Sequence, residues 1–237
     1  MLIGGIQQHT TIDYPGKLAC VVFTVGCNLR CPFCYNPSQV LPKLIAVNRD
    51  DLIPEIVFFN FLETRRGLLD GVSICGWEPT LQSDLYHFVK KIKQMWFLVK
   101  LDTNGRDGFL VEKMIDEWLL DYVAVDLKQC WWKFDQACGI PLSDSFKENY
   151  EHLLDVLKQW KVAYEYRTTV IKWLHSQENI EHMAEFLEGI DHYYLQQFVS
   201  STNLLDPDFD WESYSEEDMK KMQQVAASYV KKCFVRS

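Results

Sequence analysis

Short apolar runs alternate with longer amphipathic segments along the chain. The short runs are rich in β-branched and aromatic residues, and six are predicted as strands: 19–25, 72–75, 97–102, 122–126, 162–171 and 193–198. In the longer segments apolar residues recur at helical spacing, and six helices are predicted: 50–66, 82–95, 109–120, 145–160, 176–187 and 215–232.

The regular alternation of strand and helix predicts a parallel sheet with helices outside it. Six such units are too few for an eight-fold barrel. We therefore expect an α/β fold, a partial and open (β/α)6 barrel. No internal repeat and no linker rich in Gly or Ser divides the sequence, so a single domain over residues 1–237 is expected. In such sheets the chemistry collects at the carboxyl ends of the strands.

Charge and composition narrow the class of function. The formal net charge of −9 argues against a nucleic-acid partner held by phosphate contacts. No run of eighteen apolar residues predicts a membrane helix, and the opening MLIGGIQQHT does not resemble a secretory signal. We expect a cytoplasmic protein, where cysteines stay reduced. Three of the eight cysteines lie close together, which indicates metal or redox chemistry.

These three are Cys27, Cys31 and Cys34, in a C-x3-C-x2-C loop after the first predicted strand. Three thiolates on one short loop can ligate three irons of a four-iron cluster and leave the fourth iron open to bind a substrate. A catalytic zinc with three ligands is the alternative. The loop contains no histidine, which favours the cluster.

Phe33 completes a C-x3-C-x-φ-C pattern with an aromatic φ, and here the chain resembles the radical S-adenosylmethionine (SAM) superfamily. The opening GGIQQHTTIDYPGKLACVVFTVGCNLRCPFCYNP is similar to activases of anaerobic ribonucleotide reductase, a branch of the glycyl-radical-enzyme activases. The resemblance implies that the three cysteines hold a [4Fe–4S] cluster whose open iron binds SAM. One electron then breaks the sulfur–C5′ bond and gives a 5′-deoxyadenosyl radical.

The same resemblance implies the partners. The substrate would be a glycine of a glycyl radical enzyme, namely anaerobic ribonucleotide reductase, and a flavodoxin- or ferredoxin-type protein would donate the electron. The alternatives are a radical SAM enzyme that acts on another peptide or a small molecule, and a degenerate module that binds SAM and the cluster without catalysis. Docking is expected at residues 129–143, which include Trp131 and Trp132, and at residues 200–211.

Gly76, Trp77 and Glu78 follow the second predicted strand and resemble the Gly-Gly-Glu-Pro motif that receives the SAM ammonium group. Trp77 stands where that motif has its second glycine. Glycine allows positive φ and close approach of a ligand to the backbone, and tryptophan does neither cheaply. Either the turn tolerates Trp77 with its ring turned away from SAM, or SAM binding is altered. We expect tolerance.

Asp102 and Asp126 end neighbouring predicted strands and should face the same mouth. Two carboxylates so placed repel each other unless a cation or a basic group lies between them. Lys128 could pair with one of them or with the SAM carboxylate. The resemblance implies that Asp102, Thr103 and Asp126 help to hold a monovalent cation beside SAM.

Two later strands carry polar residues among apolar ones. Arg167 is predicted either as a salt-bridged barrel residue or as a contact to the cofactor. Gln197 either binds the SAM ribose or pairs with Gln196. The cysteines outside the loop show no ligand spacing and are interpreted as small buried apolar residues.

Overall fold

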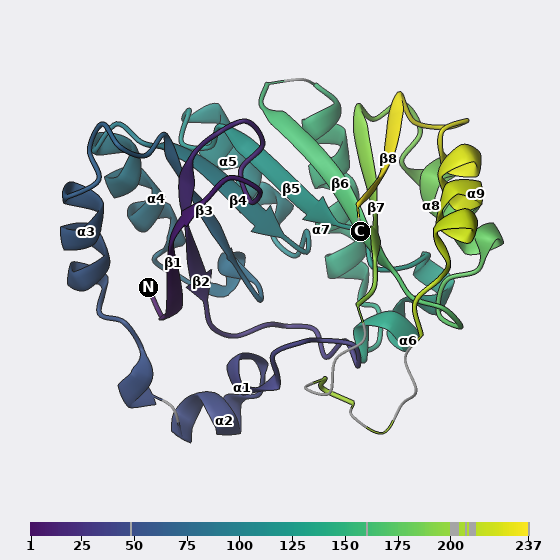
Figure 1. Cartoon of the computed structure of the whole chain (residues 1–237), viewed down its shortest axis with the longest axis horizontal. Coiled ribbons are helices and arrows are strands. Elements are labelled where there is room, and N and C mark those ends of the chain that lie inside the picture. The colour runs from purple at the N-terminus through teal and green to yellow at the C-terminus, as the bar shows by residue number, and fades with distance from the viewer. Residues whose placement is uncertain (48, 160, 200–203, 207, 209–211, 237) are drawn as a thin grey trace.

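The sheet dominates the computed structural model, which describes residues 1–47, 49–159, 161–199, 204–206, 208 and 212–236. The strands lie in sequence order: β1 (Ile3–Thr10), β2 (Ala19–Thr24), β3 (Gly71–Gly76), β4 (Leu98–Thr103), β5 (Tyr122–Asp126), β6 (Ala163–Val170), β7 (His192–Gln197) and β8 (Lys232–Arg236). β1 runs antiparallel to β2, and every later neighbour pair is parallel. Among the described residues no pairing joins β1 to β8, so the sheet stays open (Figure 1).

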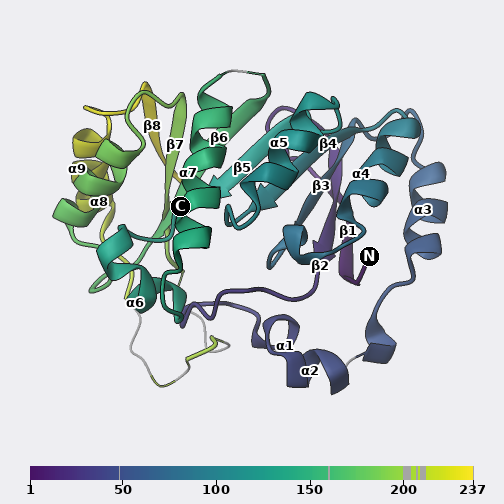
Figure 2. The same cartoon turned by 180° about the vertical axis from the view of Figure 1, so that it is seen from behind.

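Most of the helices lie on the outer face of this sheet. The described helices are α1 (Pro37–Val40), α2 (Pro42–Val47), α3 (Glu55–Glu63), α4 (Leu85–Gln94), α5 (Gly108–Asp116), α6 (Phe134–Cys138), α7 (Asp144–Lys158), α8 (Gln177–Phe186) and α9 (Glu216–Ala226). The view from behind shows α4, α5 and α7 lying over the strands (Figure 2). The predicted apolar face of α4 is buried against them through Leu85, Phe88, Val89 and Ile92. No helix of the described part is long and apolar enough to cross a membrane.

The predicted class of fold is confirmed: an open α/β sheet with helices outside it. The six predicted strands are β2 to β7, and the sheet has two further strands at its edges. β1 escaped prediction because Ile3–Thr10 contains two glycines and two adjacent glutamines, and so lacks the alternation of a half-buried strand. The last helix ends at Ala226 instead of Lys232, which leaves five residues to form β8.

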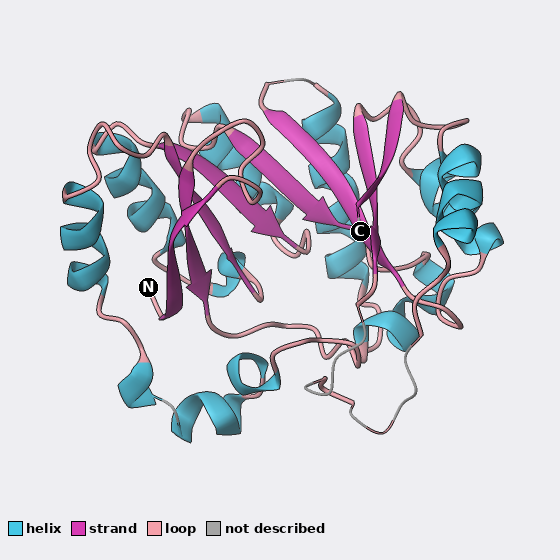
Figure 3. Cartoon of the chain, viewed as in Figure 1, coloured by secondary structure: helices cyan, strands magenta, loops and turns pink. Residues whose placement is uncertain are grey.

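Strand direction decides where the site lies. The carboxyl ends of β2 to β5 point toward the same edge, and residues 26–36, called the cysteine loop below, cross that edge (Figure 3). The short helices α1 and α2 follow the loop on the same side of the molecule (Figure 1). The motifs that were expected at strand ends can therefore meet at this one edge of the sheet.

Candidate cofactor site

The end of β2 and the end of β3 touch, and this contact shapes the site. Gly76 has φ of 116°, and a Cβ placed on it would lie 2.5 Å from the backbone N and O of Thr24. Only glycine fits this approach, as the motif predicts for its first position. Gly26 also has positive φ, 91°, and its N–H donates to Gln39 O at 2.8 Å, which turns the chain into the cysteine loop.

A cavity of about 300 Å³ opens where the cysteine loop covers the strand ends, and it is called the cofactor cavity below. Its lining includes these predicted site residues: Cys27, Cys31, Phe33, Cys34, Gly76, Trp77, Asp126 and Lys128. Three segments that are distant in sequence, the cysteine loop, the end of β3 and the end of β5, therefore meet at one place. Glu78, Asp102, Thr103, Arg167 and Gln197 do not line it.

The chemistry of the lining fits an iron–sulfur cluster. Thiols are its typical ligands, and the cysteine loop offers three without a histidine. In the described part of the chain, no three His, Cys, Asp or Glu side chains are already grouped around a point that could hold a single metal ion.

Thiolates, not thiols, bind metal, so the charges around the cysteines matter. Burial raises the pKa of Cys27 to about 12 and also raises the pKa of Cys34. The pKa of Cys31 is lowered, chiefly by a hydrogen bond with the Cys138 thiol. The Lys128 ammonium group lowers the pKa of all three cysteines and so favours their thiolates.

Each cysteine of the loop also meets a side chain from outside the loop. Asn104 Nδ2 donates to Cys27 Sγ at 3.9 Å. The Cys138 thiol lowers the pKa of Cys31, and Trp77 lines the cofactor cavity together with Cys34. Sequence reasoning missed these contacts. No role is predicted for Asn104 from the sequence, Cys138 is interpreted as a small buried apolar residue, and no spacing links either to the loop.

Glu78 is fully buried and ties β3 to β4. Its Oε1 accepts hydrogen bonds from Thr80 N at 3.1 Å, from Thr80 Oγ1 at 2.5 Å and from Thr103 Oγ1 at 2.8 Å. Its Oε2 accepts from Asn104 N at 2.6 Å. Burial raises the pKa of Glu78. The carboxylate and the Thr103 hydroxyl thus hold the turn around the cavity and face each other.

Two aspartates and three cations form a continuous chain of ion pairs, the charged ladder: Lys100, Asp102, Arg167, Asp126 and Lys128. Lys100 pairs with Asp102. Arg167 lies between the aspartates, at 2.9 Å from Asp102 Oδ2 and 3.0 Å from Asp126 Oδ1. Lys128 Nζ donates to Asp126 Oδ2 at 2.9 Å. Burial alone would raise the pKa of Asp126, but Arg167 and Lys128 lower it to about 2.

The charged ladder contains the group that separates the carboxylates of Asp102 and Asp126. A basic group, Arg167, lies between them, and both are paired with side-chain cations. The monovalent cation expected beside Asp102, Thr103 and Asp126 stays a prediction. In this structure Lys100, Arg167 and Lys128 pair with the two aspartates, and the Thr103 hydroxyl donates to Glu78.

Gln197 lies outside the cofactor cavity. Its Nε2 donates to Tyr214 O at 2.8 Å, and with Gln196 it lines a separate cavity of about 520 Å³ that also includes Lys100 and Arg167. The ladder therefore borders both cavities, with Asp126 and Lys128 on the side of the cysteine loop.

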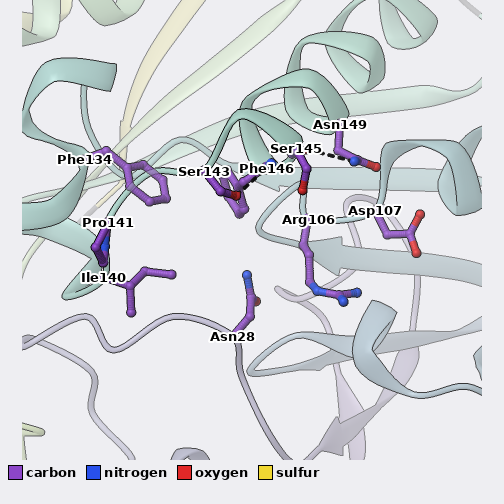
Figure 4. A pocket seen from close by; sticks show the side chains of 10 residues that line it. All are labelled: Asn28, Arg106, Asp107, Phe134, Ile140, Pro141, Ser143, Ser145, Phe146 and Asn149. Carbon is purple, nitrogen blue, oxygen red and sulfur yellow. Dashed lines mark hydrogen bonds between the residues drawn. The ribbon is translucent and has the colours of Figure 1, made fainter.

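A third hollow, of about 380 Å³, lies against the cysteine loop at Asn28. Figure 4 shows Asn28 and Arg106 facing the first turn of α7, where Ser143 and Ser145 lie. Of the two tryptophans in the expected docking segment, Trp131 packs against Tyr150 at 5.3 Å, whereas Trp132 is 62% exposed. Most of the other expected docking segment, 200–211, lies outside the described residues.

Comparison with known proteins identifies the family. The sequence model of the radical SAM superfamily matches residues 21–190, and the chain belongs to this superfamily. Its cofactors are a [4Fe–4S] cluster and SAM, and the thiol-lined cavity fits them. The chain is accordingly a radical SAM oxidoreductase.

Two relatives extend the match over most of the chain. A putative glycyl-radical enzyme activating enzyme of Methanocaldococcus jannaschii is 30% identical over 100% of this chain and 96% of its own length. A pyruvate formate-lyase-activating enzyme of Clostridium pasteurianum is 26% identical over 79% of this chain and 76% of its own.

Solved structures share the fold. A domain of pyruvate-formate lyase-activating enzyme from Bacteroides vulgatus has a TM-score of 0.53 at 21% identity, and the match covers 70% of this chain and 99% of that domain. Streptococcus suis SuiB bound to its precursor peptide has a TM-score of 0.70 at 14% identity, over 92% of this chain and 48% of SuiB. At these identities the likeness concerns the fold alone.

Proposed function

We propose that this chain is a radical SAM activase that abstracts a hydrogen atom from a glycine Cα of a partner glycyl radical enzyme. The observation that carries the proposal is the match to a putative glycyl-radical enzyme activating enzyme over the full length of this chain. The similarity of residues 4–37 to reductase activases selects anaerobic ribonucleotide reductase as the partner.

In this proposal Cys27, Cys31 and Cys34 ligate the cluster, and Phe33 packs beside it in the cofactor cavity. When bound, the cluster and SAM supply the 5′-deoxyadenosyl radical. The backbone at Gly76 and Trp77 receives the SAM ammonium group, because these residues line the cavity whereas the Glu78 carboxylate already accepts four hydrogen bonds.

The ladder supplies charge at the opposite wall of the same cavity. Lys128 faces the cysteines and is the group suited to the SAM carboxylate, since a charge-assisted hydrogen bond there adds to its pair with Asp126. Arg167, Asp102 and Thr103 hold their neighbours in place without touching the cofactor. Gln197 belongs to the second cavity, where a substrate loop could approach.

The remaining partners follow from the same proposal. A flavodoxin- or ferredoxin-type protein donates the electron, and the enzyme works in the cytoplasm. The exposed Trp132 supplies an aromatic anchor for the glycyl radical enzyme.

The test is direct. The protein is reconstituted anaerobically with iron and sulfide, reduced, and incubated with SAM and the reductase. We expect 5′-deoxyadenosine together with the doublet electron paramagnetic resonance signal of a glycyl radical. 5′-Deoxyadenosine without that doublet, with an equally fast reaction on a small molecule or another peptide, would replace the activase by the wider class of radical SAM enzymes. Cluster and SAM binding without 5′-deoxyadenosine would indicate a binding module.

A further inference from the structure

We propose that the glycyl radical enzyme docks on a surface made by Trp132, Trp173 and a small apolar cavity beside Trp132. The cavity has a volume of about 120 Å³ and is called the outer cavity below. The two tryptophans are 62% and 72% exposed. The inference rests on the proposed function, because it takes a glycyl radical enzyme as the partner, and it adds the surface that this enzyme covers.

The outer cavity lies one strand away from the cofactor cavity. Neighbouring residues of an extended chain face opposite sides, and this alternation continues past the end of β5. Asp126 and Lys128 line the cofactor cavity, whereas Leu127 and Gln129 line the outer cavity. An interface of ordinary size covers about 800 Å² of each partner, which is more than the mouth of one cavity. A protein that brings a glycine to the cofactor therefore also covers this edge.

The outer cavity can hold one apolar side chain of the partner. Trp132 borders the cavity, and its ring meets the His182 ring edge to face, with 5.0 Å between the centroids. An exposed tryptophan beside an apolar cavity is typical of a binding hot spot, where an anchor of one protein fills a pocket of the other. The remaining lining is mostly hydrophobic and includes Leu127, Cys130, Trp131, Met183 and Phe186.

Trp173 stands on the neighbouring turn, which is held rigidly. Its backbone is in the left-handed region, with φ of 72°. The turn is closed because His175 Nδ1 accepts a hydrogen bond from Ile171 N at 3.1 Å. It is joined to the outer cavity because Gln129 Nε2 donates to Leu174 O at 2.7 Å. The indole is thus presented to solvent on a fixed backbone, and a partner can bind it without first ordering the turn.

The charge around the outer cavity indicates the chemistry of the partner surface. Helix α8 carries three exposed glutamates, Glu178, Glu181 and Glu185, and no lysine or arginine. Glu178 lies four residues before His182 and Glu185 three residues after it, so both share the helix face that borders the cavity. The complementary surface is an apolar side chain surrounded by basic residues.

Two other tryptophans provide matched controls. Trp96 and Trp118 also have positive φ, 70° and 58°, and they are 90% and 79% exposed. They precede β4 and β5 and so lie at the opposite edge of the sheet. Glycine at any of the three left-handed positions removes the ring and relieves the same backbone strain. The three glycine variants therefore differ in the edge of the sheet that loses an indole.

The test compares Trp132→Ala and Trp173→Gly with Trp96→Gly and Trp118→Gly. A fifth variant, Cys130→Leu, fills part of the outer cavity and leaves both indoles in place. Iron content and urea unfolding are measured first. The dissociation constant of each cluster-loaded protein for anaerobic ribonucleotide reductase is then measured by anaerobic calorimetry.

We expect the dissociation constant to rise about tenfold in Trp132→Ala, Trp173→Gly and Cys130→Leu, and to stay at the wild-type value in the two controls. Glycyl radical formation by the three test variants should slow at low reductase concentration and recover at saturating concentration.

Two results overturn the docking surface while the activase stands. One is an unchanged dissociation constant in Trp132→Ala and Trp173→Gly while the wild type binds and activates the reductase. The other is an equal loss of affinity in Trp96→Gly and Trp118→Gly, because the effect would then not depend on the edge. A wild-type protein that neither binds the reductase nor forms a glycyl radical on it overturns the proposed function, and this inference with it.

Discussion

Replacing Arg167 by methionine should destabilise the protein strongly, because it removes the central cation of the charged ladder. The guanidinium group is 14% exposed and bonds to Asp102 at 2.9 Å and to Asp126 at 3.0 Å. Methionine fills similar space without charge. Two partly buried carboxylates on the neighbouring strands β4 and β5 would then each keep a single lysine as partner.

The magnitude follows from these contacts. A hydrogen bond to a charged group contributes about 1.5–3 kcal/mol, and removal of one partner of a buried ion pair costs about 3–5 kcal/mol. Since Lys100 and Lys128 remain, we expect a loss of about 3 kcal/mol in the free energy of unfolding. Arg66→Met is the matched control. The side chains of its pair with Glu63 are 44% and 59% exposed, and such an exposed pair contributes little to stability.

Urea unfolding of the anaerobic, cluster-free protein measures the loss. Two further results test the cause. Asp126→Asn in the Arg167→Met background should restore part of the stability, because it removes one unpaired charge. The deficit should also shrink between pH 7 and pH 5, since a carboxylate without its cation takes up a proton more readily. A loss no larger than that of Arg66→Met, or no recovery in the double variant, would refute this account of the ladder.

Three other outcomes can be checked. Alanine at any of the three loop cysteines should abolish the cluster in iron analysis and electron paramagnetic resonance, whereas Cys20→Ala should keep it. Trp77→Gly should change SAM affinity in calorimetry by tenfold or less, about 1.4 kcal/mol; a much larger gain would mean that the tryptophan obstructs SAM. Burial lowers the pKa of His175 to about 4. Below pH 6.5 the unfolded chain therefore binds more protons than the native state. The free energy of unfolding should fall by about 2 kcal/mol from pH 6.5 to 5. His175→Gln should remove that slope in urea titrations at the two pH values; an unchanged slope would mean that another group causes it.

Much of the fold could be predicted from periodicity because helix and strand patterns are local. The apolar face of α4 and the strand β5 are examples, and β5 has the predicted bounds Tyr122–Asp126. β1 and β8 could not be predicted in the same way. They are edge strands whose sequences, IGGIQQHT and KCFVR, carry little pattern, and pairing with β2 and β7 stabilises them.

The same distinction between local patterns and long-range contacts applies to the residues of the candidate site. The spacing of the loop cysteines and the place of Gly76 are local signals, and the structure brings these residues to one cavity. The partners of Arg167 and the contact between Asn104 and Cys27 join segments up to 77 residues apart. Such contacts depend on strand order and register, which a single sequence does not specify. Trp77 and Cys34 likewise come together only in the folded chain, where both line the cofactor cavity.

The burial of the charged ladder determines how its ion pairs respond to ionic strength. Dissolved salt screens solvent-exposed charges over a Debye length of about 8 Å under physiological conditions, and it screens buried pairs much less. Lys100 and Asp102 are 2% and 11% exposed, whereas carboxylates such as Glu216 and Glu217 lie in solvent on α9. Added salt will therefore weaken the electrostatic attraction between the surface and a charged partner protein, and it will leave the ion pairs inside the barrel nearly unchanged. Measurements over a series of salt concentrations can thus separate protein docking from the chemistry at the cofactor.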